Sequence, residues 1–575
     1  MSSISISIPT RAARKLLPEQ LEITNWETLH PYFEELKERK INTLEDLESW
    51  LLDRSELEAV LEEDAGWRYI KMTIDTSNKE LADAYAFFIS EINPKTAPYE
   101  DAYNKKFLQS PYVNFLKGQE FEIYLRGIKK AIELFREDNI SLFADIAKES
   151  QKYGSISGGQ SIELDGQIVT MQEAAKELKS TDRARREMVF ELMINRRLKD
   201  VEALDILFDS LRELRHKVAV NANYNNFRDY KFEAMGRFDY SIQDCFNFHD
   251  SIAEEIVPIV ADFQKEKKIQ LGYKELKPFD LDVDPSGNAP LKPFKNGEEL
   301  LDKSIQLFYK IDPYFGECLE TMREMGHLDL VSKKGKSPGG YNYPLYEVGV
   351  PFIFMNAVGT QRDLITMIHE GGHAVHSFLS RELKLTAFKS LPSEVAELAS
   401  MSMELISMDH WDVFYADEMD LKRAKKDQLE TLLKILPWVA IVDKFQHWIY
   451  TNPNHTQEQR LNQWNSINDS FSGGHIDWSD FEDAKSTSWH RQLHIFEVPF
   501  YYIEYGMVQL GAIAVWRNYK NNPQKAIEQY MAALKLGFTK SIPEIYATAG
   551  IKFDFSREYV KELADFVREE LRKLN

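Results

Sequence analysis

The chain has 575 residues, a net charge of −21 and a sequence pI near 5.2. Such acidity argues against nucleic acid or an anionic membrane as a partner, and it suits a soluble protein. Cys245 and Cys318 are far apart and form no C-x-x-C pattern, so we expect neither a disulfide framework nor a cysteine zinc site. A reducing compartment, the cytoplasm, fits this cysteine usage best.

No segment has the pattern of an export signal or of a membrane span. Basic residues in the first 24 positions are not followed by an apolar run of secretory-signal length. The most apolar stretch elsewhere, Leu432–Val442, is interrupted by a lysine and a proline and is far shorter than the roughly 20 residues that a spanning helix needs. We therefore expect a cytoplasmic protein.

Most of the chain has the 3.6-residue periodicity of amphipathic helices. The pattern is clear in Leu44–Leu61, Met171–Leu198 and Val201–Val218, and short Gly, Pro or Asn signals interrupt it. The sequence thus predicts a mainly α protein. We divide it into a helical amino-terminal region, residues 1–200, and a larger region, residues 201–575.

Two segments favour strands instead of helices. Ile162–Val169 alternates about Asp165-Gly166, which predicts a hairpin. Tyr341–Asn356 is rich in aromatic and β-branched residues and follows a Pro-Gly-Gly turn, so we expect a small sheet directly before the next helix. Such a strand could pair with an extended peptide, or it could merely pack beneath that helix, and the sequence leaves both open.

The strongest motif is His369-Glu370-Gly371-Gly372-His373. Histidines four apart on a helix point to one side, so both imidazoles can bind one Zn²⁺ while the glutamate stands beside the open coordination position. A random chain of this composition would contain H-E-x-x-H only about 0.02–0.03 times. The alternative is a helix that carries two histidines without any metal.

The neighbouring residues favour a buried helix. Thr360 and Asp363 form a capping-box pattern at its start. Gly371 and Gly372 cost about 1–2 kcal/mol of helix propensity, so something must approach closely there, either another helix or a substrate backbone. The apolar stripe expected to face the interior is formed by Leu364, Ile365, Ile368 and Val375.

A catalytic zinc site needs a third protein ligand. His376 shares the helix face, but three ligands from one rigid helix would surround a metal poorly, so we assign it a supporting role. A metzincin would have a histidine at position 379, which is Leu379, and that class is excluded. The remaining candidates are three glutamates on the next predicted helix: Glu394, Glu397 and Glu404. Pro392 suits the first turn of this helix. Taken singly, Glu394 suggests a solvated helix face.

The segment His-Glu-Gly-Gly-His-Ala-Val-His-Ser-Phe, followed by Ala396-Glu397-Leu398-Ala399-Ser400, closely resembles oligoendopeptidase F and its relative thimet oligopeptidase. The resemblance extends over the 340–356 strand region, the hairpin and the segment from His494 to Tyr505. It implies a two-lobed helical metallopeptidase that encloses a deep channel, with the small sheet next to the metal helix. It also implies one Zn²⁺ held by His369, His373 and Glu397.

The same resemblance implies roles for further residues. Glu370 would be the general base. A histidine and tyrosines would stabilise the transition state, and His494, Tyr501 and Tyr505 match best. Because the tyrosine spacing differs from that of thimet oligopeptidase, the phenol that faces the oxyanion stays open and Tyr502 remains a candidate. Glu404 could hydrogen-bond a ligand histidine or be an ordinary helix carboxylate.

These residues predict a zinc oligoendopeptidase that hydrolyses internal bonds of short unstructured peptides. Two alternatives remain, a peptidyl carboxypeptidase and a non-catalytic peptide-binding protein with a vestigial metal site. Cleavage preference and oligomeric state are not predicted. Mn²⁺ or Co²⁺ could replace Zn²⁺, because affinity order and availability choose among these ions.

Overall fold

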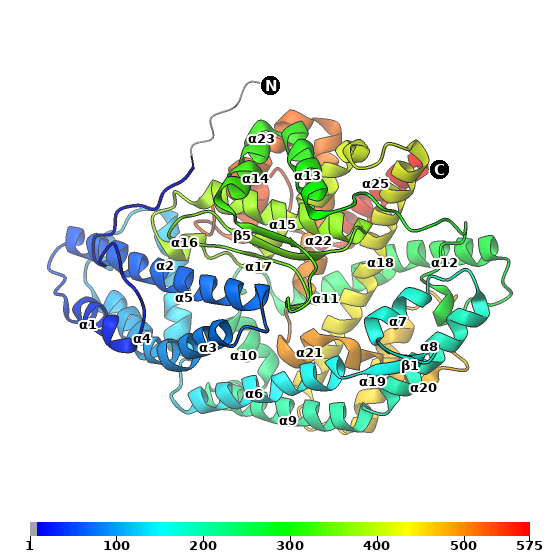
Figure 1. Cartoon of the computed structure of the whole chain (residues 1–575). Helices are drawn as coiled ribbons and strands as arrows, with labels where there is room; N and C mark the ends of the chain where they lie inside the picture. The colour runs from blue at the N-terminus through cyan, green and yellow to red at the C-terminus, as the bar shows by residue number, and fades with distance from the viewer. Residues whose placement is uncertain (1–7, 575) are drawn as a thin grey trace.

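The computed structural model describes residues 8–574, so the first seven residues of the basic amino-terminal segment lie outside the described part. The described chain is mainly helical, with two small sheets (Figure 1). Within this part, no helix combines the length and the apolarity that crossing a bilayer would require.

Five helices form a separate group at the amino-terminal side (Figure 1). They enclose their own hydrophobic core, which includes Trp50 and Phe107 and is joined by Phe388 from much later in the chain. The predicted helix at 44–61 is the first half of the longest of them. The group consists of α1 (His30–Glu38), α2 (Leu44–Ile74), α3 (Lys79–Phe87), α4 (Asn93–Gln109) and α5 (Gln119–Leu134).

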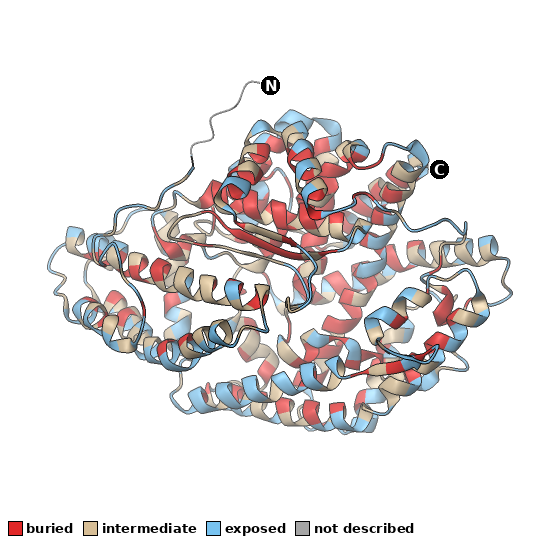
Figure 2. Ribbon diagram, in the orientation of Figure 1, coloured by how far each residue is buried: buried red, intermediate tan, exposed pale blue. Residues whose placement is uncertain are grey.

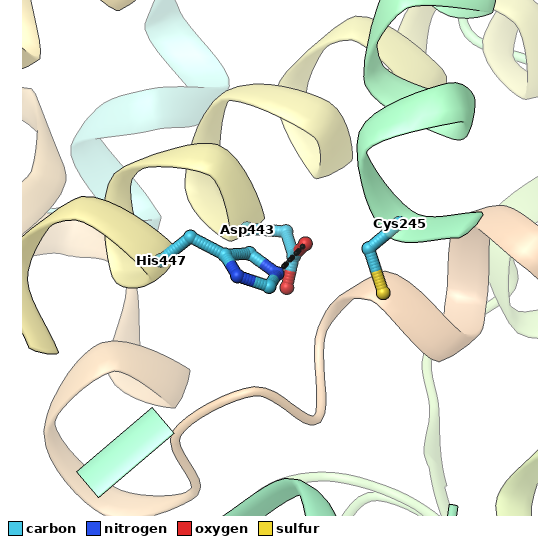
Figure 3. Close-up of side chains that lie close together, drawn as sticks. All are labelled: Cys245, Asp443 and His447. Carbon is cyan, nitrogen blue, oxygen red and sulfur yellow. Dashed lines mark ion pairs between the residues drawn. The ribbon is translucent and has the colours of Figure 1, made fainter. Parts of the chain in front are cut away.

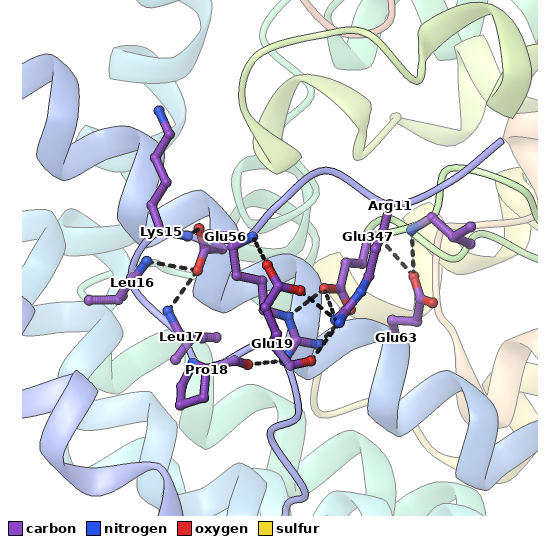
Figure 4. A network of polar contacts seen from close by, with 11 residues as sticks. Arg11, Lys15, Leu16, Leu17, Pro18, Glu19, Glu56, Glu63 and Glu347 are labelled. Atoms are coloured by element: carbon purple, nitrogen blue, oxygen red, sulfur yellow. Dashed lines mark hydrogen bonds and ion pairs between the residues drawn. The ribbon is translucent and has the colours of Figure 1, made fainter.

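The extended segment before α1 is anchored by charged residues (Figure 4). The Glu56 carboxylate of α2 accepts hydrogen bonds from three consecutive backbone N–H groups, residues 15–17. Arg14 donates to both carboxylate oxygens of Glu347, at 2.6 and 2.8 Å. Glu63 in turn accepts the backbone N–H groups of Glu347 and Val348. The extended segment before α1 therefore holds the loop around Glu347, which follows it in sequence by more than half the length of the chain.

The predicted hairpin is present as β1 (Ser161–Leu164) and β2 (Gln167–Thr170), paired in antiparallel register. Asp165 and Gly166 both have positive φ, 53° and 78°, as a two-residue turn of the primed types requires. The predicted helical segment 171–198 is two helices, because the Asp182 side chain caps a new helix start. The surrounding helices are α6 (Asp138–Gly158), α7 (Met171–Glu177), α8 (Arg183–Leu198), α9 (Val201–Asn221), α10 (Phe227–Ala234), α11 (Ile242–Ser251) and α12 (Val257–Leu271).

The expected small sheet precedes the metal-motif helix. Its order is β3-β5-β4, so the predicted 341–356 segment supplies an antiparallel pair, β4 (Tyr341–Tyr343) and β5 (Phe352–Ala357). The third strand, β3 (Leu328–Val331), pairs in parallel with β5 and was not predicted. Since β5 is central, β4 has one edge without a strand partner among the described residues.

Buried residues concentrate in the helices around this sheet (Figure 2). Helix α17 packs on both α15 and α22, and α18 packs on α22. This packing forms the main hydrophobic core. The helices of this part are α13 (Gly297–Ile311), α14 (Pro313–Met325), α15 (Gln361–Ser380), α16 (Thr386–Lys389), α17 (Ser393–Ser407), α18 (Glu418–Thr451), α19 (Gln457–Ser470), α20 (Glu482–Ser486), α21 (Leu493–Glu497), α22 (Ile503–Asn521), α23 (Pro523–Leu534), α24 (Ile542–Thr548) and α25 (Arg557–Leu574).

Candidate functional site

Helix α15 carries the H-E-x-x-H motif and begins where the sequence predicts. The Asp363 N–H donates to Thr360 Oγ1, and the Thr360 N–H donates to Asp363 Oδ2, which completes the capping box. Leu364, Ile368 and Val375 of the predicted stripe are fully buried, whereas Ile365 is half-buried. Local capping and one apolar face thus fix the helix that presents both histidines.

The two glycines of the motif allow neighbouring helices to approach α15. A Cβ on Gly372 would lie 2.7 Å from Ser400 Cα and 2.8 Å from the Ala399 carbonyl oxygen of α17. A Cβ on Gly371 would lie 2.5 Å from the ring of Phe308 in α13. Both contacts are with the protein itself, so close helix packing accounts for the glycines without a substrate backbone.

We expect Gly372→Ala to lower the free energy of unfolding by about 1–3 kcal/mol, because overpacking would push α15 away from the backbone of α17. Gly127→Ala in α5 is the matched control, since a Cβ there meets nothing within 4 Å. The control should be neutral or stabilising by up to about 1 kcal/mol. Urea unfolding of both variants measures the difference, and equal midpoints would contradict the packing argument.

Three side chains from α15 and α17 converge on one point. Glu397 Oε2 lies 3.2 Å from His369 Nε2 and 3.7 Å from His373 Nε2. The three ligand atoms all lie within 4.8 Å of one another. Tetrahedral zinc with bonds of about 2.0–2.2 Å separates its ligand atoms by about 3.3–3.6 Å, so the spacing fits such an ion. We call these three residues the metal triad.

Residues around the triad orient its members. Glu404 Oε1 accepts a hydrogen bond from His369 Nδ1 at 2.7 Å, which leaves Nε2 free to face a metal. Of the two roles left open for Glu404, the geometry therefore favours the partner of a ligand histidine. Gln428 donates to the other oxygen of Glu404, and Ser400 Oγ donates to Glu397 Oε2. Sequence reasoning missed both, although Ser400 follows Glu397 by one helical turn in the quoted motif.

The carboxylate charges around the triad suit a bound cation. Burial raises the pKa of Glu397, but the hydrogen bond from His369 and the neighbouring imidazoles outweigh it and lower the pKa to about 2. Burial lowers the pKa of His373 to about 4. Burial also lowers the pKa of His369, yet hydrogen bonds to Glu397 and Glu404 raise it well above its usual value. Two carboxylates thus attract a positive charge to this point.

Glu370 lies beside the triad without joining it. Its side chain is buried, and its backbone carbonyl accepts a hydrogen bond from Asn342 of the edge strand β4. Burial raises the pKa of Glu370 to about 7. A carboxylate with a pKa near neutrality suits an acid–base role.

The other candidates from the predicted metal region lie elsewhere. His376 is outside the triad, and burial lowers the pKa of its imidazole to about 3, so this ring is neutral. The expectation that Glu394 lies on a solvated face is wrong. Its side chain is buried and accepts a hydrogen bond from Tyr240, because α17 enters the core at its first turn. Pro392 is the residue before the helix, one position earlier than expected.

The predicted oxyanion segment forms one aromatic cluster at the start of α22. The ring of His494 lies 4.7 Å from that of Tyr502, 6.2 Å from that of Tyr501 and 6.0 Å from that of Tyr505, measured between centroids. Gln492 pairs with His494 Nδ1 at 2.6 Å, a contact that the sequence did not suggest. Burial lowers the pKa of His494 to about 4, so this imidazole is neutral.

Only two of these phenols interact electrostatically with the triad. Burial raises the pKa of Tyr501 to about 12 and the pKa of Tyr505 still further, and the negative charge of Glu397 contributes to both. Burial alone raises the pKa of Tyr502, to about 12. The structure therefore associates Tyr501 and Tyr505 with the triad more closely than Tyr502.

The backbone that precedes these tyrosines has an unusual conformation. Phe500 has φ of 68°, a left-handed value that non-glycine residues rarely adopt. Its N–H donates to Gln446 Oε1 of α18 at 2.8 Å, and its carbonyl accepts a hydrogen bond from Arg237. Arg237 also pairs with Glu504 at 2.9 Å. Buried polar groups thus hold the turn that directs Tyr501.

A cavity of about 210 Å³ opens beside the triad. Its walls come from β4, the loop after β4, α15 and the start of α17. The lining residues are Asn342, Pro344, Leu345, Tyr346, Gly349, His373, His376, Ser377, Ser380, Arg381, Lys389, Leu391 and Ala396. The contact of Arg14 with Glu347 supports the wall formed by the loop.

The chain matches a known family of peptidases. The model of peptidase family M3 matches residues 177–565, and that of the peptidase M3 N-terminal domain matches residues 18–135. Oligopeptidase PepF of Bacillus subtilis is 21% identical over 364 residues, which are 61% of this chain and 53% of the relative. An oligoendopeptidase F homolog of Lactococcus lactis is 23% identical over 344 residues, 57% of this chain and 54% of the relative. These alignments thus span about half the length of the curated relatives.

Solved structures match over nearly the whole chain. PZ peptidase A with inhibitor 2 is 25% identical with a TM-score of 0.88, covering 96% of this chain and 98% of that one. A structure named as an oligoendopeptidase F is also 25% identical, with a TM-score of 0.87 and coverage of 97% and 99%. The predicted two-lobed helical fold and the resemblance are confirmed by these matches. The chain belongs to peptidase family M3.

Proposed function

We propose that this protein is a zinc-dependent oligoendopeptidase that hydrolyses internal bonds of short peptides. The observation that carries the proposal is the metal triad with Glu370 beside it. Two imidazoles and one carboxylate are the ligand set of hydrolytic zinc enzymes, and one coordination position remains for the reaction. The names of the relatives, oligopeptidase and oligoendopeptidase, support the choice of substrate.

A zinc ion held by the triad would supply Lewis-acid activation of a water molecule and of the substrate carbonyl. Glu370 would take the proton of that water and pass it to the leaving amine. Its raised pKa, about 7, allows both steps near neutral pH, because the carboxylate can accept the proton and the acid can release it. Glu404 would keep Nε2 of His369 facing the metal.

The phenols of Tyr501 and Tyr505 would donate hydrogen bonds to the oxyanion. Burial keeps both phenols protonated at neutral pH, as a donor must be. We expect Tyr501→Phe or Tyr505→Phe to lower kcat by about 10²–10³-fold. Tyr502→Phe is the matched control and should change kcat by less than about threefold, because the Glu397 charge contributes to the pKa of Tyr501 and Tyr505, whereas burial raises that of Tyr502. A larger loss for Tyr502→Phe would reverse the assignment.

Substrate selection would follow from the site's surroundings. The outer edge of β4 and Asn342 border the cavity, so an extended peptide could pair its main chain with this strand. Such pairing requires an unfolded substrate. Incubation with a quenched-fluorescent peptide and with a folded protein of casein size tests this. We expect cleavage of the peptide only, and equal cleavage of both would count against the proposal.

The position of the cut separates the proposal from its nearest alternative. Mass spectrometry of products from a decapeptide should show internal cleavage into two fragments in the first turnover. Stepwise release from the carboxyl end would identify a peptidyl carboxypeptidase instead.

A further inference from the structure

A second group of metal-binding side chains lies outside the metal triad. Helices α11 and α18 pack on each other, and each contributes two residues four positions apart. These pairs are Cys245 with His249 and Asp443 with His447. Since residues four apart on a helix share a face, each helix presents both of its polar side chains to the other. We call these four residues the buried tetrad.

Three members of the tetrad form one close group, and His249 reaches this group through Asp443. Cys245 Sγ, a ring nitrogen of His447 and a carboxylate oxygen of Asp443 all lie within 4.8 Å of one another (Figure 3). Asp443 Oδ2 lies 3.2 Å from His447 Nε2 and 2.8 Å from His249 Nε2. One carboxylate oxygen therefore serves both imidazoles, and the thiol faces the same point.

The tetrad is enclosed by protein. Cys245, His249 and Asp443 are fully buried, and His447 is 3% exposed. Among residues 8–574, only the two histidines form ion pairs with Asp443, so no lysine or arginine neutralises it. A buried carboxylate without a permanent cation beside it needs another source of positive charge.

Several polar atoms of the tetrad have no hydrogen-bond partner within the described chain. They are Asp443 Oδ1, His249 Nδ1 and His447 Nδ1, whereas His447 Nε2 has the ion-pair contact with Asp443 Oδ2. Buried polar groups are rarely left unpaired, and three such atoms in one enclosed group need an explanation. A hydrogen-bonded network among the four side chains alone would leave them unsatisfied. A cation at this point would bind the free carboxylate oxygen and a nitrogen of His447.

We infer that Cys245, Asp443 and His447 form a second, structural transition-metal site, for which Zn²⁺ is the favoured ion, and that His249 orients the ligand carboxylate. One thiolate, one carboxylate and one neutral imidazole around Zn²⁺ sum to zero charge, which suits an enclosed site. Binding releases the thiol proton to solvent as the sulfur–metal bond forms. His249 hydrogen-bonds the ligand carboxylate at 2.8 Å, as outer partners of metal ligands do, and the burial of all four side chains keeps substrate away from this site.

Sequence reasoning could not find this site. The absence of a C-x-x-C pattern was our ground for expecting no cysteine zinc site, and the tetrad uses one cysteine with ligands from two distant helices.

The position of the tetrad suggests what a bound ion would stabilise. His447 contacts the ring of Phe500, and Phe248 of α11 packs against Gly506 of α22. The ion would therefore link α11 to α18 directly behind the turn that carries the tyrosines.

Metal analysis tests the inference. Protein produced with zinc and dialysed against metal-free buffer should lose one equivalent of zinc per chain on Cys245→Ser and on His447→Ala. Cys318→Ser is the matched control, because among residues 8–574 this second buried cysteine belongs to no cluster of three or more possible metal ligands. It should keep the wild-type zinc content. Equal zinc content in wild type and Cys245→Ser would overturn the inference.

Cobalt provides a second measurement that needs no altered tetrad. The metal triad offers no sulfur, so a thiolate-to-cobalt charge-transfer band in the near ultraviolet would report on the tetrad alone. Wild-type protein produced with cobalt in place of zinc should show the band, and so should His369→Ala/His373→Ala. Absence of the band from folded wild type, or its loss in Cys318→Ser, would overturn the inference. Failure of the triad to bind metal would leave the band unchanged.

Discussion

Glu370→Gln should abolish peptide hydrolysis while leaving the zinc content unchanged. The amide has nearly the same shape as the carboxylate but cannot accept the water proton, so we expect kcat to fall by about 10²–10⁴-fold. Because Glu370 is not among the three clustered ligand atoms, the triad keeps its metal. A continuous assay with a quenched peptide and metal analysis of the same sample measure both quantities.

The control for this variant is Glu382→Gln, an exposed glutamate in the turn after α15. It makes the same chemical change outside the site and should retain activity within about twofold. Unaltered turnover in Glu370→Gln would remove the proposed base. If wild type itself bound peptides without cleaving them, the protein would instead be the non-catalytic binding protein of the second alternative.

Loss of the third ligand should have an equally large effect. We expect Glu397→Ala to lower zinc affinity by more than about 100-fold, because removal of even an outer partner of a ligand costs 10–100-fold. Activity should vanish with the metal. Chelation of wild type should give the same loss, and added zinc should restore activity to wild type but not to the variant at stoichiometric concentration.

Glu404→Ala provides a graded comparison for the loss of Glu397. It removes the acceptor of His369 Nδ1 but no ligand, so we expect zinc affinity to fall by about 10–100-fold and to be rescued by excess zinc. Competition with a chelator of known affinity measures both variants. An affinity for Glu397→Ala that equalled the wild-type value would exclude this carboxylate as a ligand.

Much of the site was predictable because its signals are local. The cap at Thr360 and Asp363, the apolar stripe and the histidine spacing all lie within one helix, and each acts over a few residues. The hairpin turn at Asp165-Gly166 is equally local, since its two positive φ values depend on those two residues. The division at residue 200 stays a prediction.

The remaining features depend on contacts between distant segments. β3 pairs directly with β5 in parallel, although β4 lies between them in the sequence. No short sequence pattern marks such a pairing. We expected Glu394 to be exposed to solvent because the sequence of its own helix gives no sign of its hydrogen-bond partner. That partner is Tyr240, which donates to the Glu394 carboxylate in the core. Gln428 and Gln492 became visible only when the fold placed them beside Glu404 and His494.

The left-handed turn at Phe500 has a consequence for substrate binding. Its N–H group donates to Gln446, near the carboxyl-terminal end of the 34-residue helix α18, so the backbone that carries Tyr501 is fixed to a long packed helix. A peptide arriving at the cavity would then meet donors whose orientation is already set. Little conformational entropy would be lost in orienting these donors. More of the binding energy would then remain to stabilise the transition state relative to the bound peptide.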